Sequence, residues 1–174
     1  MSGPATAVQV AVRVRTFTQR ELDTGSRNII KMQTLEKGSK TWVTNPLTDE
    51  MKEFKFDFSF QSSSPDEQGI GDYASQDTVY CLLGVPMLDN CLEGKNVCLF
   101  AYGQTGSGKS YSMLGKPSTP GEEGVIPRVC KHLFQAMEKD KESGAKHTVD
   151  IQIMEIYCEQ INDLLALRKN WPAK

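Results

Sequence analysis

The sequence predicts an α/β fold with a mixed central sheet flanked by helices, and two observations carry this prediction. Patterns typical of strands alternate with amphipathic helical patterns along the 174 residues, which is the order that builds α/β sheets. An almost wholly apolar run at residues 96–102 has the composition of a strand that is covered on both faces. We also expect an antiparallel, β-rich insertion early in the chain.

The first part of the chain has strand-like periodicity. Residues 8–15 alternate valine with other residues, which is the period of a strand that presents different faces to its two sides. Shorter runs at residues 28–33 and 41–45 are also typical of strands. Phenylalanine occupies every second position from Phe54 to Phe60, and we expect these rings to form one buried face of a sheet.

A helix follows a loop rich in Ser, Gly and Pro at residues 61–71. We expect Ser75 to be its N-cap, because a serine hydroxyl accepts a hydrogen bond from the first free N–H groups of a helix. The apolar stripe of this helix ends at Gly94, and Pro86 predicts a kink within it.

The last third of the chain contains a second helix and another strand. Pro127 is suited to the first helical position, and apolar residues follow it at helical spacing. Residues 149–157 then read as a long strand, and residues 161–165 as a helical turn.

Composition and charge exclude several classes of protein. The 20 Lys and Arg residues against 22 Asp and Glu give a net charge of −2, without the overall positive charge typical of nucleic-acid binding. The longest apolar run, residues 97–102, is far shorter than the roughly 20 residues of a membrane-spanning helix, and the N-terminal residues lack the pattern of a signal peptide. We therefore expect a soluble, non-secreted protein. The five cysteines lack C-x-x-C spacing, which favours free, buried thiols over a zinc site.

The apolar run at residues 96–102 leads directly into a full match to the phosphate-loop motif G-x-x-x-x-G-K-[ST]. Its glycines let backbone N–H groups approach a polyphosphate closely, and the following helix adds the positive end of its dipole. Lys109 is expected to reach the β- and γ-phosphates, and Ser110 offers a hydroxyl oxygen suited to Mg²⁺. The predicted phosphate-binding residues are Gly103, Gln104, Thr105, Gly106, Ser107, Gly108, Lys109 and Ser110.

The string from residue 100 to residue 113, FAYGQTGSGKSYSM, resembles the phosphate loop of kinesin motor domains. Residues 73–76 are in addition similar to the kinesin-3 branch. The resemblance implies a partial motor domain of the phosphate-loop NTPase fold within residues 1–174, in which residues 8–165 follow the family order and residues 166–174 do not. Three further stretches resemble kinesin motifs: residues 12–15, 124–128 and 155–165.

The same resemblance implies that Arg13, Tyr111 and the residue at position 16 surround the adenine of ATP or ADP. A guanidinium and an aromatic ring both stack on a base. Kinesins usually have proline at position 16, so Thr16 removes an apolar packing surface and we expect a modest loss of nucleotide affinity. The predicted nucleotide-binding set therefore adds Arg13, Arg15, Thr16 and Tyr111 to the phosphate loop.

By resemblance, a complete motor is a microtubule-stimulated ATPase of the cytoplasm and cytoskeleton, with a coiled coil in the parent protein. The kinesin switch strings, Asn-x-x-Ser-Ser-Arg-Ser-His and Asp-Leu-Ala-Gly-Ser-Glu, do not occur in these 174 residues, so no catalytic residue is assigned. We expect weak or no hydrolysis, weak microtubule binding and marginal stability from this chain alone. Two alternatives stay open: a silent nucleotide-binding or interaction module derived from a motor, and a small nucleotide-dependent switch or kinase, although the guanine-specific Asn-Lys-x-Asp string is absent.

Overall fold

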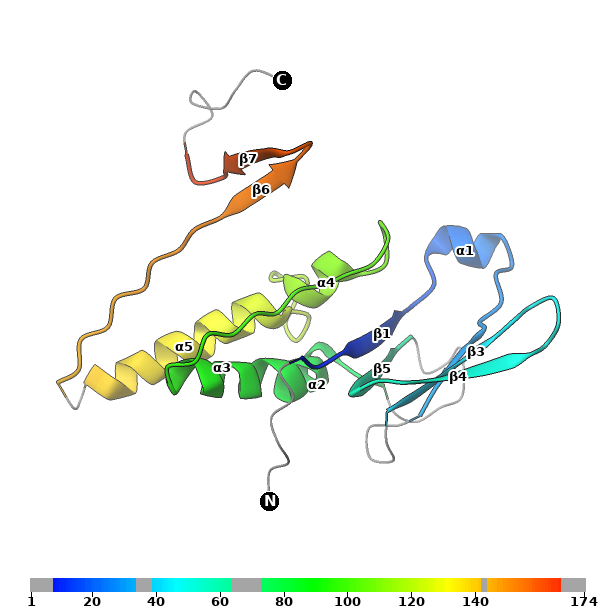
Figure 1. The fold of residues 1–174 in the computed structure, drawn as a ribbon, viewed down its shortest axis with the longest axis horizontal. Helices are drawn as coiled ribbons and strands as arrows, with labels where there is room; N and C mark the ends of the chain where they lie inside the picture. Colours follow the sequence, from blue (N-terminus) through cyan, green and yellow to red (C-terminus); the bar gives the residue numbers. More distant parts are fainter. Residues whose placement is uncertain (1–7, 34–38, 64–72, 142–143, 167–174) are drawn as a thin grey trace. The chain divides into compact units, whose positions relative to one another are not determined.

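The structure is a computed structural model that describes residues 8–33, 39–63, 73–141 and 144–166 (Figure 1). The chain divides into two units, residues 1–133 and 134–174, and each is described by itself. The elements are β1 Ala11–Arg15, α1 Gln19–Asp23, β2 Ile30–Met32, β3 Lys40–Thr44, β4 Met51–Lys55, β5 Phe58–Ser62, α2 Gln76–Val79, the π-helix η3 Tyr80–Gly84, α3 Val85–Leu92, α4 Lys109–Met113, α5 Val125–Lys141, β6 Met154–Tyr157 and β7 Gln160–Asp163.

Two small sheets form the β part of the first unit. Strands β1 and β5 pair in parallel, from Ala11 opposite Phe58 to Arg15 opposite Ser62. Strands β2, β3 and β4 lie between them in sequence and form an antiparallel sheet in the order β2-β3-β4. The predicted antiparallel insertion is therefore confirmed, and it serves as the connection that joins two parallel strands.

The phenylalanine stripe does not form one buried face, and that prediction was wrong. Strand β4 ends at Lys55 and β5 begins at Phe58, so the alternating rings belong to two different sheets. Phe54 is 44% exposed, whereas Phe60 is 1% exposed. The Asp57 carboxylate accepts a 2.7 Å hydrogen bond from the Val10 N–H. This bond joins the residue before β5 to the residue before β1. β5 also extends into the predicted loop at residues 61–71, of which the part from residue 64 lies outside the described residues.

The predicted N-cap is confirmed, because the Ser75 hydroxyl accepts a 3.1 Å hydrogen bond from the Thr78 N–H at the start of α2. The irregularity expected at Pro86 takes the form of a π-helical turn just before it, in which the Val85 N–H donates to the Tyr80 carbonyl. Proline lacks an N–H and crowds the preceding turn, and wider π-type turns relieve such crowding. The helix ends close to the predicted Gly94, at Leu92 of α3.

A small apolar core joins these elements. Phe60 of β5 packs with Val79 and Tyr80 of the helical segment and with Val125 at the start of α5. Leu99, from the apolar run before the phosphate loop, is partly buried against the same cluster. The segment that precedes the phosphate loop is therefore packed against the core through Leu99. No helix in the described part of the chain has the length and apolar character needed to cross a bilayer.

Residues 96–102 form no strand in this structure, contrary to the expectation. Within the described residues they have no ladder partner, and Tyr102 is 95% exposed. Apolar composition favours a covered strand, but a strand forms only when neighbouring strands supply hydrogen-bond partners. All five cysteines are exposed and free, so the prediction of buried thiols was also wrong.

The second unit contains a β-hairpin where the helical turn was predicted. Strand β6 begins at Met154, later than expected, and pairs antiparallel with β7, with Ile156 opposite Ile161. Cys158 and Glu159 make the two-residue connection, and both have left-handed φ angles of 48° and 60°. Such turns usually contain Gly or Asn, so the sequence carried no turn signal here. Helix α5 begins two residues before Pro127, which therefore lies in its first turn.

Gly84 offers a test of the packing in the first unit. A Cβ placed on Gly84 would lie 2.4 Å from Cδ2 of Tyr80, whose ring is buried. We expect Gly84→Ala to lower the free energy of unfolding by up to about 2 kcal/mol, because overpacking costs about 1–3 kcal/mol and the helix propensity gained offsets about 1 kcal/mol of that cost. Denaturant unfolding followed by circular dichroism measures this change. Cys91→Ala, at an exposed position of α3, is the matched control, and equal midpoints for both variants would contradict the prediction.

Candidate nucleotide-binding site

The phosphate loop, residues 103–108, leads into helix α4. Gly108 directly precedes the helix with a φ of 96°, a left-handed conformation that favours glycine. A Cβ on Gly103 would lie 2.6 Å from the Ser107 hydroxyl oxygen, so only glycine fits without a shift. Gln104, Thr105 and Gly106 are exposed at the tip of the loop. The sequence motif is therefore matched by a local conformation that requires its first and last glycines.

The Lys109 ammonium lies inside the loop. It donates 2.8 Å hydrogen bonds to the carbonyl oxygens of Gly103 and Gln104. The Ser107 N–H also donates to the Gln104 carbonyl, at 3.2 Å. The loop thus curves around a positive charge, which is the arrangement that can receive phosphate oxygens.

Ser110 fits the role of a magnesium ligand. It lies in the first turn of α4 and is exposed, and its hydroxyl makes no hydrogen bond to another described residue. A hydroxyl is a hard oxygen ligand of the kind that Mg²⁺ accepts beside phosphate oxygens. No group of three or more His, Cys, Asp or Glu side chains that could hold a metal ion occurs among the residues that the structure describes.

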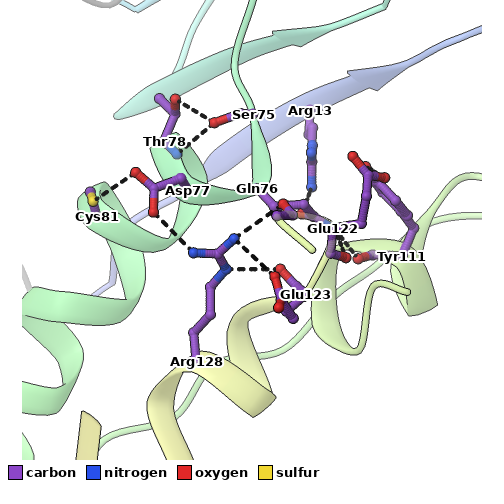
Figure 2. Close-up of polar contacts among 11 residues, drawn as sticks. Arg13, Ser75, Gln76, Asp77, Thr78, Cys81, Tyr111, Glu122, Glu123 and Arg128 are labelled. Carbon is purple, nitrogen blue, oxygen red and sulfur yellow. Dashed lines mark hydrogen bonds and ion pairs between the residues drawn. The ribbon is translucent and has the colours of Figure 1, made fainter. Parts of the chain in front are cut away.

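Arg13 belongs to a polar cluster that includes Gln76, Tyr111 and Glu122 (Figure 2). Its guanidinium donates to the Ser62 hydroxyl at 2.8 Å, to Gln76 Oε1 at 2.9 Å and to the Ser112 hydroxyl at 3.0 Å. Burial lowers the pKa of Arg13 below its usual value. The remaining nitrogen, Nη2, is buried and has no hydrogen-bond partner among the described residues. One strong donor of this group is therefore unsatisfied by the described residues.

Tyr111 lies against Arg13. The guanidinium carbon of Arg13 is 5.2 Å from the centroid of the Tyr111 ring, and the Tyr111 hydroxyl donates a 2.6 Å hydrogen bond to Glu122 Oε2. Burial, together with this bond to the Glu122 carboxylate, raises the pKa of Tyr111 well above its usual value. The structure thus brings together Arg13 and Tyr111, which the resemblance placed at one site, and their contact with a base stays a prediction.

Arg15 and Thr16 lie differently. The Arg15 guanidinium is engaged by Glu21 of α1 through two 2.7 Å hydrogen bonds, and it also donates to the Thr16 carbonyl at 2.7 Å. The stem of Arg15 nevertheless borders the phosphate loop, because a Cβ on Gly108 would lie 3.9 Å from the Arg15 Cβ. Thr16 is exposed. Their predicted contact with nucleotide is untested, and the head group of Arg15 is held by a carboxylate.

Sequence reasoning missed three members of this region. Glu21 closes a capping box with Thr18 at the start of α1, and the T-x-x-E spacing could have revealed it. Glu122 and Gln76 gave no signal, because their contacts with Tyr111 span 11 and 35 residues and belong to no local motif.

The described geometry defines an α/β protein with a phosphate loop. The chain belongs to the kinesin family, since the family described as "Kinesin motor domain" matches residues 13–173. It is 42% identical over 160 residues to the kinesin-like protein unc-104 of Caenorhabditis elegans, and 44% identical over 162 residues to the kinesin-like protein KIF1A of Rattus norvegicus. Each match covers 91% of this chain but only 10% and 9% of the relative. Both relatives are of the kinesin-3 branch.

Solved structures of kinesin motors are similar to this chain as well. A chain of KIF14 with ADP in complex with a microtubule superposes with a TM-score of 0.73 at 38% identity, and the match covers 96% of this chain and 44% of that chain. A KIF14 dimer with AMP-PNP in complex with a microtubule gives the same TM-score over 42% of its chain. The structure is therefore a kinesin motor fold, mixed α/β, of which this chain supplies under half.

The Arg15–Glu21 pair predicts a pH dependence. Hydrogen bonds from the Arg15 guanidinium, and then from the Thr18 backbone and hydroxyl, lower the pKa of Glu21 to about 2. Glu21 therefore stabilises the fold fully above its unfolded pKa, about 4.5, and this contribution is lost as the pH falls toward 2. We expect Glu21→Gln to be slightly less stable than the wild type at neutral pH, with the difference shrinking between pH 4.5 and 2.

Urea unfolding of both chains at a series of pH values measures this difference. Glu50→Gln, at an exposed residue with no described ion pair, is the control. A gap between wild type and Glu21→Gln that stays constant down to the lowest pH would disprove the role assigned to Arg15.

Proposed function

We propose that this chain is the nucleotide-binding part of a motor that couples ATP hydrolysis to movement along microtubules, at the cytoskeleton. The observation that carries the proposal is the phosphate loop, which curves around the Lys109 ammonium and opens into α4 in a chain of the kinesin family. The solved KIF14 relatives hold ADP or AMP-PNP in complex with a microtubule, which supports the assignment of both partners. The motor-like region is proposed to span residues 8–165, and residues 166–174 to lie outside it.

The phosphate side of the site is assigned to the loop. Backbone N–H groups of residues 103–108 and the Lys109 ammonium would bind the phosphates of ATP or ADP, with Lys109 moving from the loop carbonyls to phosphate oxygens. The Ser110 hydroxyl would hold Mg²⁺, which neutralises charge on the β- and γ-phosphates when bound.

The base side is assigned to Arg13 and Tyr111, with Thr16 beside them. The Arg13 guanidinium, which lies over the Tyr111 ring with Cζ 5.2 Å from the ring centroid, and the phenol offer π-surface for a purine. Thr16 replaces the proline usual in the family and contributes less apolar surface. Arg15 would act near the loop through its stem, because its guanidinium is bound to Glu21.

Hydrolysis by the complete motor needs groups that orient water at the γ-phosphate. The sequence contains neither kinesin switch string, and the chain spans under half the length of the solved motors. The absence of both switch strings from these 174 residues also favours a second candidate, a nucleotide-binding or interaction module without ATPase activity.

Substitution of Lys109 tests the phosphate site. We expect Lys109→Ala to weaken binding of Mg·ATP by about 10- to 100-fold, the loss expected for charge-assisted hydrogen bonds of about 1.5–3 kcal/mol. Isothermal titration calorimetry measures the affinity. Lys131→Ala, at an exposed position of α5, is the control and should bind as the wild type does. Equal affinities of Lys109→Ala and wild type, or a wild type that binds no Mg·ATP, would refute the proposal.

The chain alone should be a poor motor. We expect slow ATP hydrolysis that added microtubules accelerate less than about twofold, because no residue of this chain is assigned to positioning water. A coupled ATPase assay with and without microtubules, combined with co-sedimentation, measures both properties. Tight, nucleotide-dependent co-sedimentation together with strong stimulation would contradict this expectation.

A further inference from the structure

We infer that Gln76 is a positioning residue for the base side of the site, holding the Arg13–Tyr111 pair in place with the help of Glu122. The inference rests on the proposed function and deepens it, because it names the group that sets the geometry of base recognition. Figure 2 shows Gln76 between Arg13 and the Tyr111–Glu122 pair.

Gln76 is the first residue of α2 and is 3% exposed. Its Oε1 accepts a 2.9 Å hydrogen bond from Arg13 Nη1. Its Nε2 donates a 2.7 Å hydrogen bond to the Tyr111 carbonyl and a longer one, 3.4 Å, to the Glu122 carbonyl. One buried amide thus joins β1, α4 and the loop before α5.

The chemistry of the bridge requires an amide. A guanidinium only donates hydrogen bonds and a backbone carbonyl only accepts them, so the group between them must accept at one end and donate at the other. A carboxylate at position 76 would accept from Arg13 but would face the Tyr111 carbonyl with a second acceptor. A methionine would fill a similar volume and make neither bond.

Tyr111 is held at both of its ends. Gln76 binds its backbone carbonyl, and Glu122 accepts from its hydroxyl at 2.6 Å. Arg13 is held by Ser62, Gln76 and Ser112, and keeps one buried nitrogen without a partner beside the Tyr111 ring. The Arg13–Tyr111 pair is therefore fixed before a ligand arrives, and a pair ordered in advance is a preorganised surface for a base.

The competing explanation is that Gln76 only satisfies buried polar groups. The two explanations predict different effects on ligand affinity when Gln76 is replaced. A positioning role affects the base, whereas a general loosening of the fold affects the phosphate loop as well.

The test compares Mg·ATP with Mg·tripolyphosphate, which offers phosphates and no base. We expect Gln76→Glu and Gln76→Met to weaken Mg·ATP by about five- to tenfold or more, and to leave Mg·tripolyphosphate within about twofold of the wild type. Gln135→Met, at an exposed position of α5, is the matched control and should change neither affinity. Lys109→Ala should weaken both ligands. Calorimetry gives the affinities, and circular dichroism gives the folded fraction of each variant.

Glu122→Ala provides a second route if the Gln76 variants do not fold. It removes the anchor of the Tyr111 hydroxyl from a half-buried loop position. We expect a smaller, about two- to fivefold loss of affinity for Mg·ATP and an unchanged affinity for Mg·tripolyphosphate.

Several outcomes would overturn the inference. Equal losses of both ligands in folded Gln76 variants would assign Gln76 a structural role only, and unchanged affinity for both would remove any role. If the Gln76 variants are unfolded, an equal loss of affinity for Mg·ATP and Mg·tripolyphosphate in Glu122→Ala would likewise indicate a structural role only. A wild type that binds neither ligand would instead refute the proposed function, and one that binds both equally well would refute base recognition while leaving the phosphate site intact.

Discussion

The first unit depends on the burial of one positive charge. Moving the Arg13 guanidinium out of water is costly unless acceptors surround it. Those acceptors come from Ser62, Gln76 and Ser112, which lie 49, 63 and 99 residues further along the chain. The hydrogen bonds of one side chain therefore join strand β5, helix α2 and helix α4 to β1, and they bring together the residues of the proposed base side. The same burial keeps the guanidinium close to the Tyr111 ring.

This polar cluster matters more because the apolar core is small. The buried hydrophobic cluster centres on Phe60 and Tyr80, while large apolar side chains such as Phe100 and Ile156 are exposed. Exposed apolar surface on this scale is typical of faces that other parts of a protein cover. The solved relatives extend well beyond the matched region, since the match covers 44% of the KIF14 chain. A directional network of hydrogen bonds then specifies an arrangement that hydrophobic burial alone would leave loosely defined.

Features set by local chemistry could be predicted from the sequence, and features set by distant partners could not. The Ser75 cap and the phosphate loop each depend on a few adjacent residues, and both were predicted. The division of the phenylalanine stripe between two sheets depends on which strand pairs with β1. It cannot be predicted from the residues of the stripe alone, because β1 lies far away in the sequence. The turn at Cys158 uses left-handed residues that any sequence rule would pass over. Gln76 has the appearance of an ordinary polar helical residue until its partners are known.

The two sides of the site therefore have different origins, and α4 connects them. The phosphate side is contiguous in sequence, whereas the base side is assembled from β1, α2 and the loop before α5. Lys109, Ser110 and Tyr111 are consecutive residues in the first turns of α4. Gln76 holds the Tyr111 carbonyl, whereas the Lys109 ammonium is held by the loop carbonyls of Gly103 and Gln104, so the two proposed subsites have separate anchors on one helix. In the proposed site, a base against Tyr111 and a phosphate at Lys109 would share one short helix, so the distance between the two subsites would be set before nucleotide binds.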